Sequence, residues 1–332
     1  MSKSTSSSSA RRDFLRTGLA AAGLSTMVAS AAADANAATS EASATENIST
    51  TPDSSADRVE QLPQMPFGKT TISRLIVGSN CFAAGSHLSV FVDREMAAYY
   101  TPEQIQRTVR RCEDVGVNCW QISGTQYLDL YCGLRDEGSR MRCISIDSDS
   151  NLDHLPALAA AGCLGVAHHG EASDSLFKRG DIQRIGEYLK RVHDAGMMAG
   201  VSTHMPDVVD AIESAGFEVD YYMTCVYERH RSEEDLKQLL GMVPLPPREV
   251  YLREDPDRMF NAVRRTERPC LAFKILAAGR LSEGSWMVER AFRETFEAIR
   301  PTDGVIVGIY DKFTDQPAEN AEYARRFGTV VS

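Results

Sequence analysis

The chain has 332 residues, with 46 acidic residues against 36 Lys and Arg residues and a formal net charge of −10. This acidic balance, without a basic stripe beyond the N-terminal region, argues against nucleic acid as a partner. Hydrophobic residues make up 43% of the chain, enough for a sizeable core. No apolar run after the N-terminal region is long enough to span a membrane, so we expect a soluble mature protein.

Residues 1–37 are predicted to be a twin-arginine signal peptide. The paired arginines at 11–12 are followed by Phe and Leu, the pattern that this export route reads. The weakly apolar stretch over 17–33 is too short and too rich in small residues for a permanent membrane span. Ala-Asn-Ala at 35–37 is a small-x-small cleavage site. We therefore expect an exported, for example periplasmic, protein that has the twin-arginine translocation machinery as a partner.

Residues 38–63 are predicted to form a disordered linker, because Ser, Thr, Ala and acidic residues leave little to bury. The folded domain is expected over residues 64–332, close to the roughly 250 residues typical of one βα barrel. The eight cysteines form no C-x-x-C pair, which argues against a structural zinc site. Since the twin-arginine route carries proteins that folded in the reducing cytosol, we expect mostly free thiols.

From residue 71 onward, eight short apolar runs alternate with amphipathic helical stretches. Nearly continuous apolar runs are typical of parallel strands covered on both faces, and strand–helix alternation gives right-handed βα units. No G-x-G-x-x-G follows an early strand, which disfavours a Rossmann sheet. The sequence therefore predicts an α/β protein with a (β/α)8 TIM barrel. Strands are expected at 74–78, 117–122, 142–146, 165–169, 198–203, 221–227, 271–276 and 305–309, with helices beginning near 101, 127, 152, 181, 206, 255, 286 and 316.

The active site of such a barrel lies at the C-terminal ends of its strands. Four histidines follow or end predicted strands: His168, His169, His204 and His230. Because strand side chains alternate, only one of His168 and His169 faces the barrel mouth. That histidine suits general acid–base catalysis, since imidazole titrates near neutral pH. Together with Glu171, Asp174 and His204 it would alternatively hold a divalent metal, or merely order the loops.

Lys274 lies inside an otherwise apolar predicted strand. A buried lysine is costly without a partner, so it should reach a carboxylate, a phosphate or a substrate. Desolvation also lowers the pKa of a lysine and allows it to form a Schiff base. The next residues, 277–280, end in Gly-Arg and are suited to wrapping a phosphate. Pairing with an interior carboxylate is the structural alternative.

The folded part resembles the aldo/keto reductases, NADP-dependent enzymes on a (β/α)8 barrel. The likeness runs over residues 65–328 and rests on Phe-Gly-Lys-Thr at 67–70, Gly-Val-Asn at 116–118, Gly-Val-Ser-Thr at 200–203, and Gly308 followed by a helix that begins at Gln316. It implies NADP as a cofactor and a small carbonyl compound as substrate. The implied cofactor contacts are Ser202 and Thr203 to the nicotinamide amide, Tyr227 stacked on the ring, Gly308, Gln316 and Asn320 at the adenine end, and Lys312 at the 2′-phosphate.

That family's catalytic Asp, Tyr, Lys and His are mostly replaced. Gln-Ile-Ser at 121–123 stands in place of Asp-Thr-Ala, and Tyr127 comes one residue late for the tyrosine. Ser145 and Asp147 stand where the lysine is expected, so Lys274 is the candidate substitute. His168 or His169 matches the histidine. The candidate catalytic residues are therefore Tyr127, His168, His169 and Lys274.

Three hypotheses follow from these residues. The first is an exported, NADP-linked oxidoreductase for a carbonyl or sugar-like small molecule, with its cofactor bound before export. The second is a lyase, isomerase or epimerase that needs no nicotinamide and uses the His, Glu and Lys residues of the mouth, with or without a divalent metal. The third is a barrel that binds a ligand without catalysis.

Overall fold

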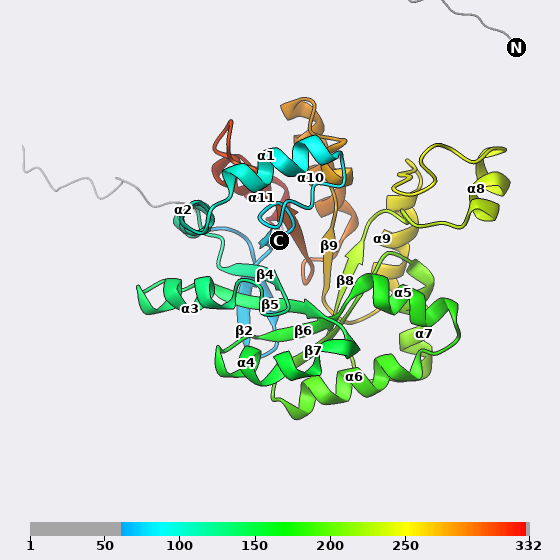
Figure 1. Cartoon of the computed structure of the whole chain (residues 1–332), viewed down its shortest axis with the longest axis horizontal. Helices are drawn as coiled ribbons and strands as arrows, with labels where there is room; N and C mark the ends of the chain where they lie inside the picture. Colours follow the sequence, from blue (N-terminus) through cyan, green and yellow to red (C-terminus); the bar gives the residue numbers. More distant parts are fainter. Residues whose placement is uncertain (1–60, 330–332) are drawn as a thin grey trace, which may run out of the picture. The chain divides into compact units, whose positions relative to one another are not determined.

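The protein is an eight-stranded parallel barrel surrounded by helices, seen in a computed structural model that describes residues 61–329 (Figure 1). The barrel closes in the order β10-β3-β4-β5-β6-β7-β8-β9, every neighbouring pair being parallel. The predicted TIM barrel is therefore confirmed. Its strands are β3 Leu75–Gly78, β4 Cys119–Ser123, β5 Arg142–Asp147, β6 Gly165–His168, β7 Met198–Thr203, β8 Tyr221–Cys225, β9 Cys270–Phe273 and β10 Gly304–Gly308.

The helices follow the predicted alternation, with additions. Thr101 caps α2 by accepting a hydrogen bond from the backbone N–H of Gln104, as its sequence context indicates. The start expected near residue 152 falls in a 3₁₀ turn, Asp149–His154. The helices are α1 Val90–Tyr99, α2 Pro102–Asp114, α3 Leu128–Asp136, α4 Leu155–Ala160, α5 Gly170–Lys178, α6 Gln183–Asp194, α7 Pro206–Ala215, α8 Glu233–Leu240, α9 Asp255–Arg265, α10 Ser285–Ala298 and α11 Gln316–Gly328.

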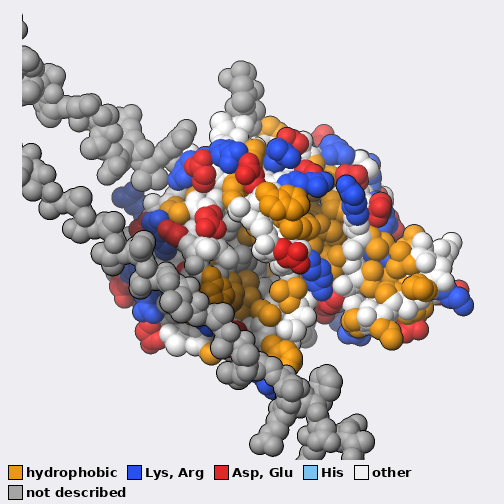
Figure 2. All heavy atoms as spheres, turned by 90° about the horizontal axis from the view of Figure 1, so that it is seen from above, with side chains coloured by type: hydrophobic (Ala, Val, Ile, Leu, Met, Phe, Trp, Pro, Cys, Tyr) orange, Lys and Arg blue, Asp and Glu red, His pale blue; other side chains and the backbone are white. Residues whose placement is uncertain are grey.

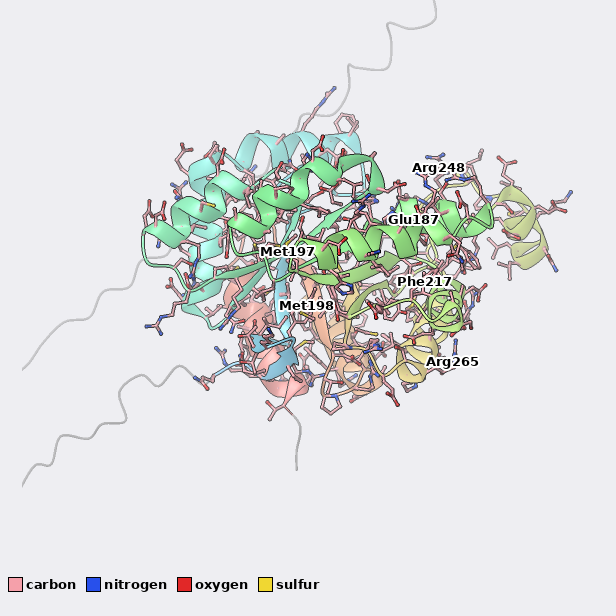
Figure 3. All side chains as sticks on the ribbon, turned by 90° about the horizontal axis from the view of Figure 1, so that it is seen from below. Glu187, Met197, Met198, Phe217, Arg248 and Arg265 are labelled. Carbon is pink, nitrogen blue, oxygen red and sulfur yellow. The ribbon has the colours of Figure 1, made fainter. Side chains whose placement is uncertain are left out.

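An antiparallel hairpin, β1 Gln64–Phe67 with β2 Thr70–Ser73, closes the N-terminal end of the barrel. Its buried side chains, Met65, Phe67 and Ile72, belong to the same apolar cluster as the inward-facing residues of the strands. The turn residue Gly68 has φ +58°, and a Cβ there would lie 2.6 Å from the sulfur of Met198, which Figure 3 labels. With this end plugged, the opposite end is left for a site.

Because side chains alternate between the two faces of each strand, the buried apolar residues form two clusters, one inside the barrel and one between the barrel and its helices. Ile144, Ala167 and Leu271 point into the barrel, whereas their neighbours Cys143, Val166 and Ala272 pack against the helices. Tyr221 fills much of the interior, and Gly200 on the adjacent strand makes room for it, since a Cβ at Gly200 would lie 2.5 Å from the Tyr221 ring. Beyond this layer of inward-facing side chains, the strands end at the open, C-terminal end of the barrel, which we call the mouth.

The connection between β8 and α9 projects from the barrel and carries α8. Figure 1 places α8 at the edge of the domain, and Figure 2 shows apolar side chains on the lobe at that edge. The exposed apolar residues there are Leu239, Leu240, Met242 and Leu245. Over residues 61–329, no helix combines the length and apolarity that a membrane crossing requires. The predicted signal peptide and all but the last residues of the predicted linker lie outside this range.

Candidate active site

Left-handed backbone concentrates in three connections at the C-terminal end of the barrel. Within residues 61–329, the non-glycine residues with positive φ are Ala84, His87, Glu249, Lys274, Ala277 and Ala278. They follow β3, β8 and β9, and the three connections touch one another. Arg280 donates to the carbonyl of His87 at 3.1 Å, and His87 Nδ1 lies 3.2 Å from Glu249 Oε1. Backbone strain of this kind gathers at functional sites, so this end of the barrel is the candidate active site.

Lys274 directly follows β9 and is largely buried. In the described part of the chain, no hydrogen bond or ion pair holds its amine. Burial, helped by the charge of Arg229, lowers the pKa of Lys274 to about 8. With that pKa, roughly one amine in ten is neutral at pH 7. Lys274 is thus a nucleophile without a protein partner.

Three groups act on Lys274: the thiol of Cys81 after β3, the thiol of Cys225 at the end of β8, and the carboxylate of Glu249 in the connection after β8. Burial raises the pKa of Cys81 to about 11 and that of Cys225 to about 12. Both are therefore protonated near neutral pH and provide no thiolate for the lysine. Glu249 is already paired with Arg229. Glu249 therefore does not serve as a partner of Lys274 alone, as the structural alternative required.

A histidine–carboxylate pair lies beside Lys274. His204 follows β7, and its Nδ1 is 2.7 Å from Asp174 Oδ2 on α5. The other Asp174 oxygen accepts the Thr203 hydroxyl at 2.5 Å. Burial lowers the pKa of His204, although Asp174 opposes the change. The structure therefore brings His204 and Asp174 together, with the imidazole neutral at pH 7.

A charged network joins α5 to the connection after β8. Buried Arg229 donates to Glu171 Oε1 at 3.0 Å and to Glu249, and His230 lies between the two carboxylates. Burial alone would raise the pKa of Glu249, but hydrogen bonds from His230, His87 and Tyr251 hold it well below its ordinary value. This network was not predicted. The only sequence signal was Glu-Arg-His-Arg at 228–231, directly after a strand.

The two adjacent histidines face opposite sides of β6. His168 is fully buried on the outer side, with Nδ1 2.8 Å from Ser173 Oγ and its ring 4.8 Å from that of Tyr188 on α6. Burial lowers the pKa of His168 to about 4. His169 follows the inward-facing Ala167 by two positions and is half-buried as the cap of α5. Of the two, His169 is therefore at the mouth.

Tyr127 lies on the outer side of β4 rather than beside a lysine. Its ring stacks on that of Trp120 at 5.6 Å and meets Phe82 at 6.3 Å. Burial raises the pKa of Tyr127 to about 12. Gln126 donates to its hydroxyl oxygen. The structure therefore does not bring Tyr127 and Lys274 together as an activated proton donor.

The predicted nicotinamide contacts are largely used by the protein itself. Ser202 points inward near His204, but the Thr203 hydroxyl is donated to Asp174. Tyr227 is buried and packs on Tyr251, with ring centroids 5.1 Å apart. A tyrosine packed in this way offers no open face to a nicotinamide ring.

Two of the predicted adenine and phosphate contacts, Lys312 and Gln316, are engaged as well. Lys312 Nζ lies 2.7 Å from Glu95 Oε2 on α1, and Gln316 Oε1 accepts the backbone N–H of Tyr310 at 2.7 Å. Asn320 is buried within α11, and the space a Cβ at Gly308 would need is filled by the Cys81 sulfur, 2.9 Å away. Bound NADP would therefore have to displace the ion pair of Lys312 and the hydrogen bond of Gln316. Residues 61–329 also contain no group of three or more His, Cys, Asp or Glu side chains placed to hold a metal ion.

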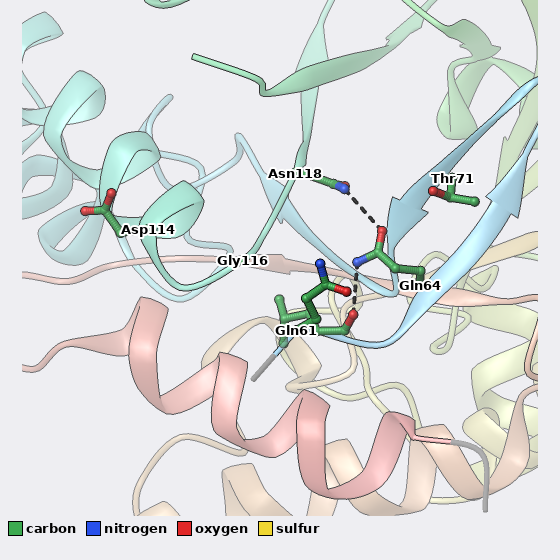
Figure 4. A pocket seen from close by; sticks show the side chains of 7 residues that line it. Gln61, Gln64, Thr71, Asp114, Gly116 and Asn118 are labelled. Carbon is green, nitrogen blue, oxygen red and sulfur yellow. Dashed lines mark hydrogen bonds between the residues drawn. The ribbon is translucent and has the colours of Figure 1, made fainter. Parts of the chain in front are cut away.

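Two surface grooves lie away from the mouth. One of about 410 Å³ lies beside the hairpin at the N-terminal end of the barrel, where Asn118 donates to Gln64 (Figure 4). The other, of about 480 Å³, runs along α6 past Tyr188 and Asp149. Neither contains Lys274 or His204. Perturbed titrating groups and strained backbone, rather than groove volume, mark the site.

Comparisons with known proteins support the fold. No protein-family model matches the sequence, and the curated proteins include no significant relative. Two solved structures of provisionally assigned aldo-keto reductases from Pseudomonas aeruginosa are similar, with TM-scores of 0.51 and 0.52 at 12% and 13% identity. Each alignment covers 81% of this chain and 97% or 98% of the other. A truncated 3-deoxy-D-arabino-heptulosonate 7-phosphate synthase from Thermotoga maritima has a TM-score of 0.46 at 11% identity, covering 80% of this chain and 90% of the synthase. At these identities the likeness is one of barrel architecture.

Proposed function

We propose that this protein is an enzyme that acts on the carbonyl group of a small, sugar-like substrate through an imine with Lys274. The observation that carries the proposal is the amine itself. It is largely buried, it has no partner among residues 61–329, and its pKa is lowered to about 8. Such an amine is a nucleophile near neutral pH. This is the second of the three hypotheses drawn from the sequence.

The chemistry follows from the neutral form of Lys274. Its nitrogen adds to the carbonyl carbon, and the carbonyl oxygen takes a proton to give a carbinolamine. Loss of that hydroxyl as water, after a second protonation, leaves an iminium bond between carbon and Nζ. The half-buried His169 and the exposed carboxyl group of Glu171 stand at the same end of the barrel and supply polar contacts for substrate hydroxyls. Polar groups around one nucleophile suit a hydroxylated carbonyl compound.

Borohydride trapping tests the proposal. The protein is mixed with dihydroxyacetone, D-glyceraldehyde, D-fructose or pyruvate, reduced with sodium borohydride, and analysed by intact and peptide mass spectrometry. We expect one covalent addition per chain, mapped to Lys274. Lys274→Arg should abolish it, whereas Lys190→Arg, which changes an exposed lysine on α6, should not. Absence of a Lys274 adduct with all four compounds would overturn the proposal.

NADP-linked carbonyl reduction is the second candidate. It is favoured by the resemblance in the sequence and by Lys312, whose ion pair with Glu95 is exposed and therefore weak enough for a phosphate to displace. Titration of the protein with NADPH, followed by nicotinamide fluorescence, tests it. Saturable binding that Lys312→Met weakens would favour reduction. No binding up to millimolar NADPH would remove it.

We also propose that residues 1–37 direct export by the twin-arginine route, because paired arginines, a weakly apolar stretch and a cleavage triplet occur in the required order. Expression of the full chain in a bacterium with this route should yield a periplasmic product that begins at Ala38. Replacing both arginines at 11–12 by lysine should retain the precursor in the cytosol. Normal export of that variant would refute the assignment.

A further inference from the structure

The pair of His204 and Asp174 is built more firmly than packing alone requires. Asp174 receives three donors: the imidazole Nδ1 at 2.7 Å, the Thr203 hydroxyl at 2.5 Å, and the backbone N–H of His204 at 3.2 Å. All three residues are buried. A carboxylate held in this way fixes both the orientation and the tautomer of the ring that donates to it.

The tautomer determines what the ring can do. Because Nδ1–H is donated to Asp174, the lone pair of the neutral imidazole is on Nε2. In residues 61–329 no hydrogen bond engages Nε2. Gly170 lies against the ring near Cε1 and Nδ1, where an added Cβ would be 3.0 Å from Cε1 of His204 and 3.1 Å from Ser202 Oγ. The ring is thus an oriented base with one free nitrogen.

Lys274 and His204 are neighbours at the mouth of the barrel. The ring of Phe273, the residue before Lys274, meets the His204 ring edge-on at 5.7 Å. The charge of Lys274 is also among those that lower the pKa of His204. The groups facing His204 are Asp174 and Glu171 from α5, Arg229 and His230 from the connection after β8, and Lys274 after β9.

We propose that His204 removes the proton from the carbon next to the imine carbon, with Asp174 as its positioning residue, so that the protein is an epimerase of hydroxylated carbonyl compounds. This inference rests on the imine proposed at Lys274. An imine acidifies the adjacent C–H bond, and a neutral imidazole within reach is the matching base.

The proton transfer needs no reactant besides solvent water. The proton passes from carbon to Nε2, the C–H electron pair forms a carbon–carbon double bond, and the imine electrons move to Nζ, which gives an enamine. A proton from solvent water added to the same carbon on the other face inverts it and restores the iminium, and His204 returns its own proton to the solvent. Hydrolysis of that iminium then frees Lys274 and the epimerised carbonyl compound.

Exchange with solvent deuterium tests this step. Dihydroxyacetone is incubated with the protein in deuterium oxide, and the loss of its carbon-bound proton signal is followed by proton NMR, in parallel with borohydride trapping. We expect wild-type protein to give both the adduct and exchange. His204→Gln should keep the Lys274 adduct and lose exchange at least about 100-fold, in line with the worth of a general base. Lys274→Arg should lose both.

Controls separate the possible failures. His193→Gln removes the histidine of another His–Asp pair, with Asp220 on the outside of the barrel, and should change neither signal. Asp174→Asn should shift the acid limb of the exchange profile to lower pH, which a merely structural role would not do. Gly170→Ala, which keeps every reacting group, should slow exchange by crowding the ring. Exchange that persists in His204→Gln, or an adduct without exchange in wild type, overturns this inference alone. No adduct in wild type overturns the proposed function itself.

Discussion

Replacing Lys274 by Met should stabilise the fold at pH 7 while abolishing imine formation. Met has nearly the same shape as Lys and no charge, so it keeps the packing and removes the burial penalty. The pKa of Lys274 falls from the ordinary 10.5 to about 8 on folding. The fold is therefore less stable by about 3 kcal/mol when Lys274 is protonated than when it is neutral.

The sign of the pH dependence follows from proton binding. Between pH 8 and 10.5 the unfolded chain binds more protons at this residue than the folded chain, so wild-type stability rises with pH there. The advantage of Lys274→Met should therefore be about 3 kcal/mol at pH 7 and close to zero above pH 10.5.

Urea unfolding of both proteins at pH 7, 9 and 10.5 measures this difference. Subtracting the two free energies isolates residue 274, because all other titrating groups are the same in both proteins. Lys190→Met, on the exposed face of α6, serves as the control and should change stability by less than about 0.5 kcal/mol at each pH. A Lys274→Met variant that is no more stable than wild type at pH 7, or whose advantage is independent of pH, would refute the burial argument.

Two further changes test the barrel and its charged network. Gly200→Ala places a Cβ about 2.5 Å from the buried Tyr221 ring and should lower the free energy of unfolding by about 1–3 kcal/mol in urea. Gly133→Ala, with open space around it, should not destabilise, and equal effects of the two would contradict the packing. Glu249→Gln should destabilise by about 1–3 kcal/mol at pH 7, because it leaves buried Arg229 short of a partner. Since the folded-state pKa of Glu249 is lowered, this loss should shrink as the pH falls below the ordinary 4.5, and a pH-independent loss would count against the network.

The barrel was predictable because each βα unit is a local pattern. Continuous apolar runs and capped helices, such as Thr101 before Pro102, are visible within a dozen residues. Three helices were missed. Of these, α8 carries a readable capping box, Ser232 with Asp235, whereas α5 begins at a glycine that resembles a loop.

The candidate site was predictable only in part. Lys274 stood out as a charge inside a predicted apolar strand, although the structure ends β9 one residue earlier, at Phe273. His204 and Asp174 were both noted as candidates, but nothing local pairs residues 30 positions apart. The partners of Lys312 and of Arg229 depend on contacts between distant connections. Left-handed backbone at non-glycine residues leaves no mark in the sequence either. Of the cofactor contacts that the resemblance implies, Thr203, Lys312 and Gln316 have hydrogen bonds within the chain, which no local pattern shows.

The covalent state of Lys274 after borohydride reduction tests the central claim most directly. With wild-type protein and the four carbonyl compounds, we predict a single adduct on a peptide that contains Lys274, absent from Lys274→Arg and retained in Lys190→Arg. Its yield should rise with pH toward a plateau above pH 8, as the amine loses its proton. Adducts spread over surface lysines, with none at Lys274, would contradict the account.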